Sequence, residues 1–201
     1  MNPATILSVC LTSTASASIV GVTGSTTWLG SPPAACGPFQ LVSANAFAWD
    51  EQQNIPLTLA CDMTNNPGNS GSPIPGVISG LFDSHFIHFD GATGVTNAIG
   101  TVTFSGPIIG VIFTPNTLTA SDALAGSLGT VYPTGYPFRG INTSTPSFCS
   151  INANTITFNL NAFPTVGEVA QIRVLTHPAP APGSLAVLGA AGLVCGRRRR
   201  P

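Results

Sequence analysis

The chain has 201 residues, of which 43 % are hydrophobic and 6 % charged, and it contains 22 Gly and 18 Pro. Ample hydrophobic residues with few charges argue against intrinsic disorder, and frequent Gly and Pro exclude a helical bundle or a coiled coil. The basic residues are all Arg, and apart from a terminal run at 197–200 they are isolated, so no nucleic-acid partner is expected.

Residues 1–17 contain a short apolar stretch that ends in Ala15-Ser16-Ala17, which has the small-x-small form of a signal-peptidase site. The basic residues that usually open a signal peptide are missing from the start of this segment. We expect a signal-peptide remnant here. The alternative interpretation is the first strand of the following domain.

Residues 18–177 show a hydrophobic period of two rather than 3.6, which predicts strands. Apolar and polar residues alternate in the segments 57–61, 101–104, 155–160 and 170–174. The segment 108–113 is apolar throughout and should be buried on both faces. Gly and Pro turn signals separate these segments. We therefore predict one all-β domain, an antiparallel β-sandwich of jelly-roll-like form.

One short helix is expected in this domain, over residues 119–126. Ser121 would cap its N-terminus, because a Ser hydroxyl accepts a hydrogen bond from a free helical N–H group, and Gly126 would end it. The preceding Pro115-Asn116 is interpreted as a turn.

The C-terminal segment, residues 178–201, combines three features in order. A Pro-rich linker is followed by an uncharged apolar run (184–196) and then by the Arg cluster. The linker should stay extended, and the apolar run should form a helix about 20 Å long, shorter than the roughly 30 Å hydrocarbon core of a bilayer. The competing interpretations are a frayed tail, a buried C-terminal helix and a permanent membrane anchor.

This tail resembles the PEP-CTERM sorting signal of exported bacterial proteins, which has a Pro-Glu-Pro motif, an apolar helix and terminal basic residues. The matching residues are Pro180, Pro182, Gly183, Arg197, Arg198, Arg199 and Arg200. Ala181 stands where the signal usually has Glu. The resemblance implies transient membrane retention through the C-terminal helix and processing by an exosortase. It also implies export through the inner membrane of a Gram-negative bacterium, to the cell envelope or the extracellular matrix.

The body of the chain also resembles a family of PEP-CTERM proteins, over residues 46–176. The segments that carry this resemblance are 47–54, 84–90, 100–104, 109–111, 121–122, 129–133 and 139–140. That family is known by its sorting tail rather than by an established reaction. The resemblance implies a structural or adhesive role in association with exopolysaccharide.

The segment Gly68-Asn69-Ser70-Gly71-Ser72-Pro73 resembles the nucleophile loop of chymotrypsin-like serine proteases. A nucleophilic Ser needs a His as general base and a carboxylate that orients the His. In that protease family both precede the Ser, whereas here His85 and His88 follow it. The flanking Asn, Gly and Pro residues explain the motif as a turn-rich loop, so no catalytic residue is expected.

His85 and His88 lie three residues apart in an aromatic segment that is predicted to be a strand. Side chains at this spacing point to opposite faces of a strand, so the two rings cannot chelate one ion. We expect Phe86 and His88 on one face, with His85, Ile87 and Phe89 on the other. Both His residues are interpreted as structural.

The acidic residues are scattered along the chain, and no EF-hand spacing occurs. Asp83 and Asp90, together with loop carbonyls, are the candidates for a Ca²⁺ site. No other metal or cofactor is expected.

Of the five cysteines, Cys10 and Cys195 lie in the two terminal segments. The remaining Cys36, Cys61 and Cys149 allow at most one disulfide in an oxidising compartment. Cys36–Cys61 is the predicted pair because the loop between these residues is short, although three pairings are open. The absence of a Cys-x-x-Cys pair argues against structural zinc.

Aromatic residues suggest a sugar-binding platform, with packing as their competing role. The candidates are Trp28, Phe47, Trp49 and the segment Tyr132–Tyr136. Binding is therefore the activity we expect. A secreted hydrolase with a site assembled across loops, and a permanently anchored surface protein, are the competing hypotheses.

Overall fold

The computed structural model describes residues 18–141 and 147–179. Within these residues the chain is mostly β, with two sheets, the helix α1 (Pro115–Ala125) and the short 3-10 helix η1 (Pro164–Val166). The proposed signal-peptide remnant and the sorting residues from Pro180 onward, including the C-terminal apolar helix, lie outside the described residues. No helix in the described ranges is long and apolar enough to cross a bilayer.

One sheet has five strands in the order β1-β8-β11-β10-β6, and its pairs are antiparallel. The bounds of these strands are β1 (Ile19–Gly24), β6 (Gly68–Asn69), β8 (Asn97–Phe104), β10 (Phe148–Asn152) and β11 (Thr155–Asn161). Every second side chain of β8 and β11 is buried, as the alternating sequence predicted.

The other sheet has seven strands, with the main order β2-β4-β7-β12-β9 and with β3 and β5 each paired to β7. The bounds are β2 (Thr26–Trp28), β3 (Val42–Ser43), β4 (Ala46–Asp50), β5 (Ile55–Cys61), β7 (Gly76–Gly91), β9 (Ile108–Ile112) and β12 (Ala170–Thr176). The pairs β2–β4 and β3–β7 are parallel, which corrects the expectation of purely antiparallel pairing. Parallel pairing needs a long crossover, and the chain between β2 and β4 is long enough to provide one.

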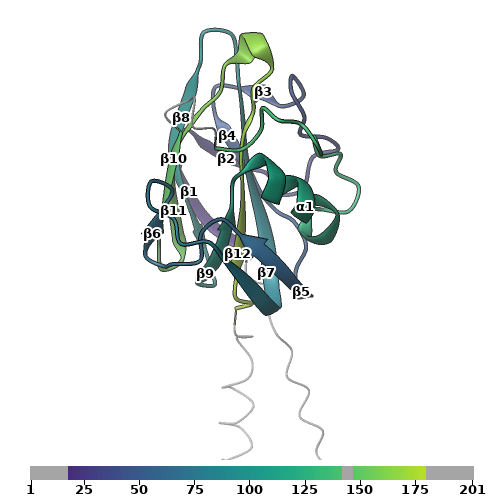
Figure 1. Ribbon diagram of the computed structural model, residues 1–201. Helices are drawn as coiled ribbons and strands as arrows, with labels where there is room; N and C mark the ends of the chain where they lie inside the picture. The colour runs from purple at the N-terminus through teal and green to yellow at the C-terminus, as the bar shows by residue number, and fades with distance from the viewer. Residues whose placement is uncertain (1–17, 142–146, 180–201) are drawn as a thin grey trace, which may run out of the picture.

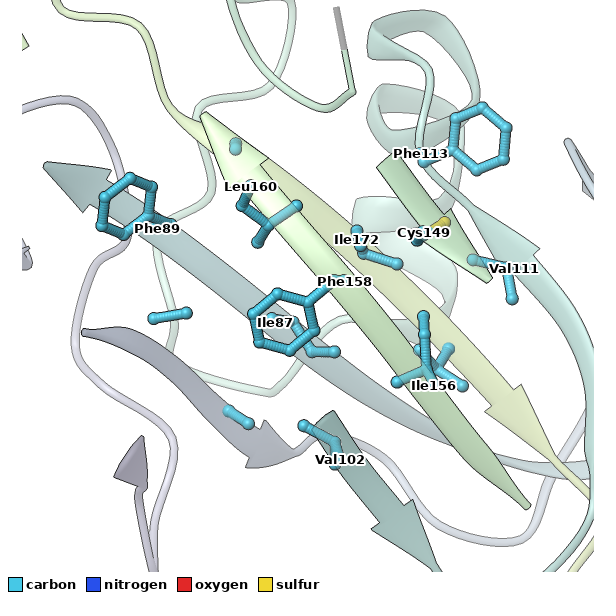
Figure 2. Packing of buried hydrophobic residues seen from close by; sticks show 14 of the residues in the cluster. Ile87, Phe89, Val102, Val111, Phe113, Cys149, Ile156, Phe158, Leu160 and Ile172 are labelled. Atoms are coloured by element: carbon cyan, nitrogen blue, oxygen red, sulfur yellow. The ribbon is translucent and has the colours of Figure 1, made fainter. Parts of the chain in front are cut away.

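The two sheets pack face to face around a continuous hydrophobic cluster. In Figure 2, Phe158 and Leu160 of β11 lie over Ile87 of β7 and Ile172 of β12. All four side chains are almost completely buried. The shared core explains the period of two, because each sheet presents alternate side chains to the other.

The opposite face of the seven-stranded sheet is covered by α1 and by loops (Figure 1). A second hydrophobic cluster lies there, in which Trp49, Phe86 and Leu175 of the sheet join Leu118 of the helix. Strand β12 is consequently buried along its whole length and on both faces. Its polar residues Gln171 and Arg173 therefore face a covered layer rather than solvent.

Helix α1 begins a turn earlier than expected, at Pro115 instead of residue 119. Thr114 is its N-cap residue, and Pro is favourable in a first helical turn because its missing N–H would have no intrahelical partner. Ser121 is inside the helix, so the prediction that it caps the N-terminus is wrong. Gly126 ends the helix, as predicted.

Candidate functional site

Ser70 of the protease-like motif has a structural role. Its N–H donates to the carbonyl of Cys149 at 2.8 Å, and its hydroxyl accepts the N–H of Cys149 at 3.0 Å. The side chain thereby joins the loop after β6 to β10. The two His rings that sequence reasoning weighed as general bases are hydrogen-bonded to other residues, on the seven-stranded sheet.

His85 lies between a carboxylate and a hydroxyl, an arrangement that the sequence did not reveal. Its Nδ1 is 2.7 Å from Oδ1 of Asp50, and its Nε2 is 3.0 Å from Oγ1 of Thr176. The order of groups is that of a catalytic triad. However, His85 and Thr176 are both fully buried, so a substrate carbonyl has no access to the hydroxyl in this structure. The chain of bonds ties β4, β7 and β12 together.

A second buried polar network lies under helix α1, centred on Arg173. Its guanidinium donates to both carboxylate oxygens of Glu51, at 2.7 and 3.1 Å, and to Oδ1 of Asp122 at 3.3 Å. It also donates to Ser121 and lies 5.0 Å from the centre of the Phe86 ring. Burial by itself would lower the pKa of Arg173, but the neighbouring Glu51 carboxylate raises it above its usual range, so the guanidinium stays charged.

Arg139 extends this network along the sheet. It donates to both oxygens of Asp122, at 2.6 and 3.2 Å, and to Oε1 of Gln171 at 2.8 Å. The amide nitrogen of Gln171 then donates to the carbonyl of Cys36 at 2.9 Å and to Nδ1 of His88 at 3.0 Å. Each Arg is thus paired with acidic partners in a layer that excludes water, as a buried charge requires.

His88 is held as a neutral ring by these contacts. Because Nδ1 accepts a hydrogen bond from Gln171, the ring proton must reside on Nε2. Burial lowers the pKa of His88 to about 3, and the charge on Arg139 contributes in the same direction. Its Nε2 and the Oδ1 atom of Asp90, two residues further along the same face of β7, have no hydrogen-bond partner among the described residues.

The predicted Cys36–Cys61 disulfide is wrong, because Cys36, Cys61 and Cys149 are buried free thiols. The thiol of Cys36 points to the carbonyl of Val131 at 3.8 Å, whereas Cys61 ends β5 beside β9. Burial raises the pKa of each thiol to about 12. Such thiols stay protonated at neutral pH and react poorly.

The structure does not bring the two candidate Ca²⁺ ligands together. Asp83 and Asp90 lie on opposite faces of β7, about 23 Å apart along the strand at the usual rise per residue. Each accepts a backbone N–H, Asp83 from Asn54 and Asp90 from Phe39, both at 2.5 Å. No group of three or more His, Cys, Asp or Glu in residues 18–141 and 147–179 is placed to hold a metal ion.

The aromatic residues proposed as a sugar platform do not form one exposed surface in the structure. Trp49 is fully buried and packs against Phe86, with ring centres 5.1 Å apart. Tyr132 donates to Glu51 and packs against the same Phe86 ring. Trp28 is half-exposed at β2. Of the proposed residues, Tyr136 alone takes part in the aromatic cluster described next.

Three loops bring Phe39, Tyr136 and Phe138 together around Gly167, and we call these residues the aromatic cluster. The Tyr136 and Phe138 rings meet edge to face with centres 5.8 Å apart. The Tyr136 hydroxyl donates to the carbonyl of Gly167 at 3.0 Å. A Cβ on Gly167 would lie 3.2 Å from both the Phe39 ring and the Tyr136 hydroxyl, so Gly lets the two rings approach.

Phe39 is held in an unfavourable backbone conformation at this cluster. Its φ of 63° is in the left-handed region, which bulky residues rarely adopt, and 63 % of the residue is exposed. The Asp90 carboxylate fixes the turn by accepting the Phe39 N–H. Burial raises the pKa of Asp90, although the hydrogen bonds from Phe39 and Gln40 oppose that shift. Strain of this kind is concentrated at functional sites, and here it directs an apolar ring to solvent.

Sequence reasoning missed Phe39 and Phe138 because they lie in loops without any periodicity. The available signal was a set of aromatic residues next to Pro and Gly, at Pro38-Phe39 and Tyr136-Pro137-Phe138. With 53 % of Phe138 exposed, the aromatic cluster offers two largely exposed Phe rings beside the Tyr136 hydroxyl. Sugars bind to such surfaces through stacking on the rings and hydrogen bonds to the polar groups.

Comparison of the chain with protein-family models, curated proteins and solved structures finds no match.

Proposed function

We propose that this protein is exported through the inner membrane of a Gram-negative bacterium and has a structural or adhesive role at the cell envelope or in extracellular polysaccharide. In this proposal the sorting tail, with Pro180, Pro182, Gly183 and the Arg cluster, determines the localisation. In this proposal an exosortase-type enzyme processes the tail, which is held in the membrane by a short C-terminal helix. The folded domain is a jelly-roll-like β-sandwich.

A binding role is favoured over catalysis by the surroundings of the candidate catalytic groups. The Ser70 hydroxyl is engaged with Cys149, and the Asp50–His85–Thr176 chain ends in a hydroxyl without exposed surface. The three thiols of the described residues are buried as well. Each of these groups contributes to the packing of the domain.

The observation that carries the proposal is the exposed Phe39 ring of the aromatic cluster. A sequence under selection for stability alone would avoid Phe in a left-handed backbone conformation, because this conformation costs about 1–3 kcal/mol. The ring therefore gives a reason to place a ligand at this cluster, and a polysaccharide is the ligand that an exported protein of this kind would meet.

Affinity electrophoresis of the full chain in gels containing polysaccharide tests this site. We expect dextran, hydroxyethyl cellulose or extracted exopolysaccharide to retard the protein, and Phe39→Ala and Phe138→Ala to weaken that retardation several-fold. Leu128→Ala is the matched control, since Leu128 is 90 % exposed but lies outside the aromatic cluster. Equal mobility of the unaltered protein with and without each polysaccharide would contradict the proposed function.

The proposed processing and localisation are tested separately, by mass spectrometry of the mature C-terminus in the native host. We expect a product that ends before Arg197, and a variant without residues 178–201 that is no longer retained at the envelope. A mature chain that keeps all four terminal Arg residues would argue for a permanent anchor instead.

A further inference from the structure

The solvent-facing side of the five-stranded sheet forms a regular array of hydroxyl and amide groups, which we call the outer face. The pairing register places Thr23 of β1, Thr101 of β8, Thr157 of β11 and Ser150 of β10 side by side. A neighbouring row runs through Thr103, Thr155 and Asn152. The outer face thus repeats hydrogen-bonding side chains across four strands.

Hydrogen bonds between strands hold the array in place. The hydroxyls of Thr23 and Thr101 are 2.8 Å apart, and those of Thr103 and Thr155 are 3.1 Å apart. Rows on a sheet repeat at about 4.8 Å across the strands and about 7 Å along them. The β-branched Thr side chains are stiff at χ1, so the hydroxyls keep these positions with little loss of entropy when a ligand binds.

Apolar side chains border the hydroxyl rows on one side. Ile99 and Phe148 both lie opposite Asn159 in the register, on either side of β11. Ile99 is 55 % exposed and Phe148 is 41 % exposed. A row that combines an amide with an aromatic ring and an aliphatic side chain suits a ligand with both hydroxyl groups and apolar C–H faces, as a sugar ring has.

The charge of this surface excludes several other partners. The strands of the five-stranded sheet contain no Asp, Glu, Lys or Arg. An acidic polysaccharide, a nucleic acid or an anionic lipid surface would find no cation there to bind. The array also lacks Trp, Tyr and Arg, the side chains that contribute most of the binding energy at protein–protein interfaces. The Ser and Thr side chains that it does contain rarely contribute strongly to such interfaces.

We propose that the outer face binds a neutral, extended polysaccharide chain, with hydroxyls along the Thr rows and a sugar ring against Phe148. This inference rests on the proposed association with polysaccharide and adds to it a second surface and a ligand class. Neutral glycans fit an uncharged array because each of their hydroxyls both donates and accepts, as each Thr hydroxyl does.

Affinity electrophoresis of three variants of the full chain tests the outer face. The first, Thr101→Val with Thr103→Val, removes hydroxyls from both rows of β8 while it keeps the side-chain shape. The second is Phe148→Ala. The control is Thr58→Val, because Thr58 also forms an exposed cross-strand hydroxyl pair, with Ser79 at 2.8 Å, but on the β5–β7 pair of the other sheet.

We expect the double variant to bind dextran or hydroxyethyl cellulose about tenfold more weakly, as a loss of one to two hydrogen bonds would cause. Phe148→Ala should weaken binding by a similar factor, because the sugar ring loses its contact with the aromatic face. The Thr58→Val variant should bind as the unaltered protein does. Circular dichroism and the urea midpoint of each variant report whether the fold is kept.

Three results would overturn the inference. If both outer-face variants bind normally while Phe39→Ala loses binding, the polysaccharide site is the aromatic cluster alone and the proposed function stands. If the protein binds alginate rather than neutral chains, the ligand class is wrong. If no polysaccharide retards the unaltered protein, the proposed function fails together with this inference.

Discussion

Arg173 is completely buried, yet it retains its charge because two carboxylates surround it. Glu51 accepts two of its hydrogen bonds and Asp122 accepts a third. A buried ion pair of this kind contributes little net stability, because desolvation of the charges offsets their attraction. Its geometry ties β12 to the residue that follows β4 and to α1, since Glu51 comes directly after β4 and Asp122 lies in the helix.

His88 makes the stability of the domain sensitive to acid. Its pKa is 6.5 in the unfolded chain and about 3 in the folded one, so between these values the unfolded state binds a proton that the folded state does not. Stability from this residue is therefore present above pH 6.5 and is lost as the pH falls toward 3. The loss should be about 1.4 kcal/mol per pH unit below roughly pH 5.5.

Urea unfolding at pH 5.5 and pH 4 measures this effect. The unaltered protein should lose about 2 kcal/mol more than His88→Gln over that interval, since Gln does not titrate. The carboxylates titrate in both proteins, so the difference between the two proteins isolates the contribution of His88. An equal loss in the two proteins would show that His88 is not held neutral.

At the scale of elements, helix α1 depends on a residue far from it in sequence. The Asp62 carboxylate accepts the N–H groups of Phe113 and Thr114, at 2.6 and 2.8 Å, and the hydroxyl of Thr117 at 2.7 Å. Free N–H groups at a helix N-terminus need an acceptor, and the helix dipole favours a negative one. Asp62 meets both requirements from the end of β5.

Replacing this carboxylate should destabilise the domain measurably. We expect Asp62→Ala to lower the free energy of unfolding by about 1–2 kcal/mol, and Asp62→Asn by less, because the amide keeps one acceptor oxygen. Urea denaturation followed by circular dichroism provides the measurement. Asn116→Ala, at an exposed position in the same turn, should change little. A midpoint for Asp62→Ala equal to that of the unaltered chain would contradict this assignment.

Local sequence predicted the strands well and the helix start poorly, for a physical reason. The alternation at 155–160 reflects one buried face, which each strand encodes within itself. The start of α1 depends on Asp62, some fifty residues upstream, and no local pattern contains that contact. Likewise, the polar Gln171 and Arg173 suggest a solvent-facing edge until α1 and its loops cover them.

For the candidate binding site, the sequence predicted the aromatic character but not the residues that form it. Aromatic residues were expected to form a binding surface, but Trp49 is a core residue and Tyr132 packs against the core. Phe39 and Phe138 join Tyr136 through the meeting of three loops, which depends on tertiary structure. The segments that carry the family resemblance contain residues of the buried polar network, namely Glu51, His88, Asp122 and Arg139. The resemblance therefore concerns the interior of the domain rather than its surface.

At the scale of the whole molecule, the acidic and Arg side chains of the described residues lie largely away from the surface. Each Asp and Glu of the chain, and both Arg residues of the described part, are buried or half-buried. The surface that remains consists of hydroxyl, amide and apolar groups. Association through such a surface depends on hydrogen bonds and apolar contact rather than on long-range electrostatic attraction.

Binding to neutral polysaccharide should therefore be insensitive to salt. We expect the dissociation constant to change less than twofold between about 0.01 and 1 M NaCl, over which screening would abolish attraction between exposed charges. Isothermal titration with soluble dextran provides the measurement. A steep decrease in affinity with salt would mean that charged groups at the surface contribute after all.

The described chain begins and ends beside a single turn. Ser18 accepts the N–H of Ser105, and His177 donates to the carbonyl of Pro107, so both ends leave at the link between β8 and β9 (Figure 1). The 3-10 helix η1 lies at the opposite pole of the domain (Figure 1), and the aromatic cluster surrounds Gly167, the residue that follows η1. A tether attached after His177 would therefore join the domain at the pole away from η1, and it would leave the aromatic cluster free to meet a ligand.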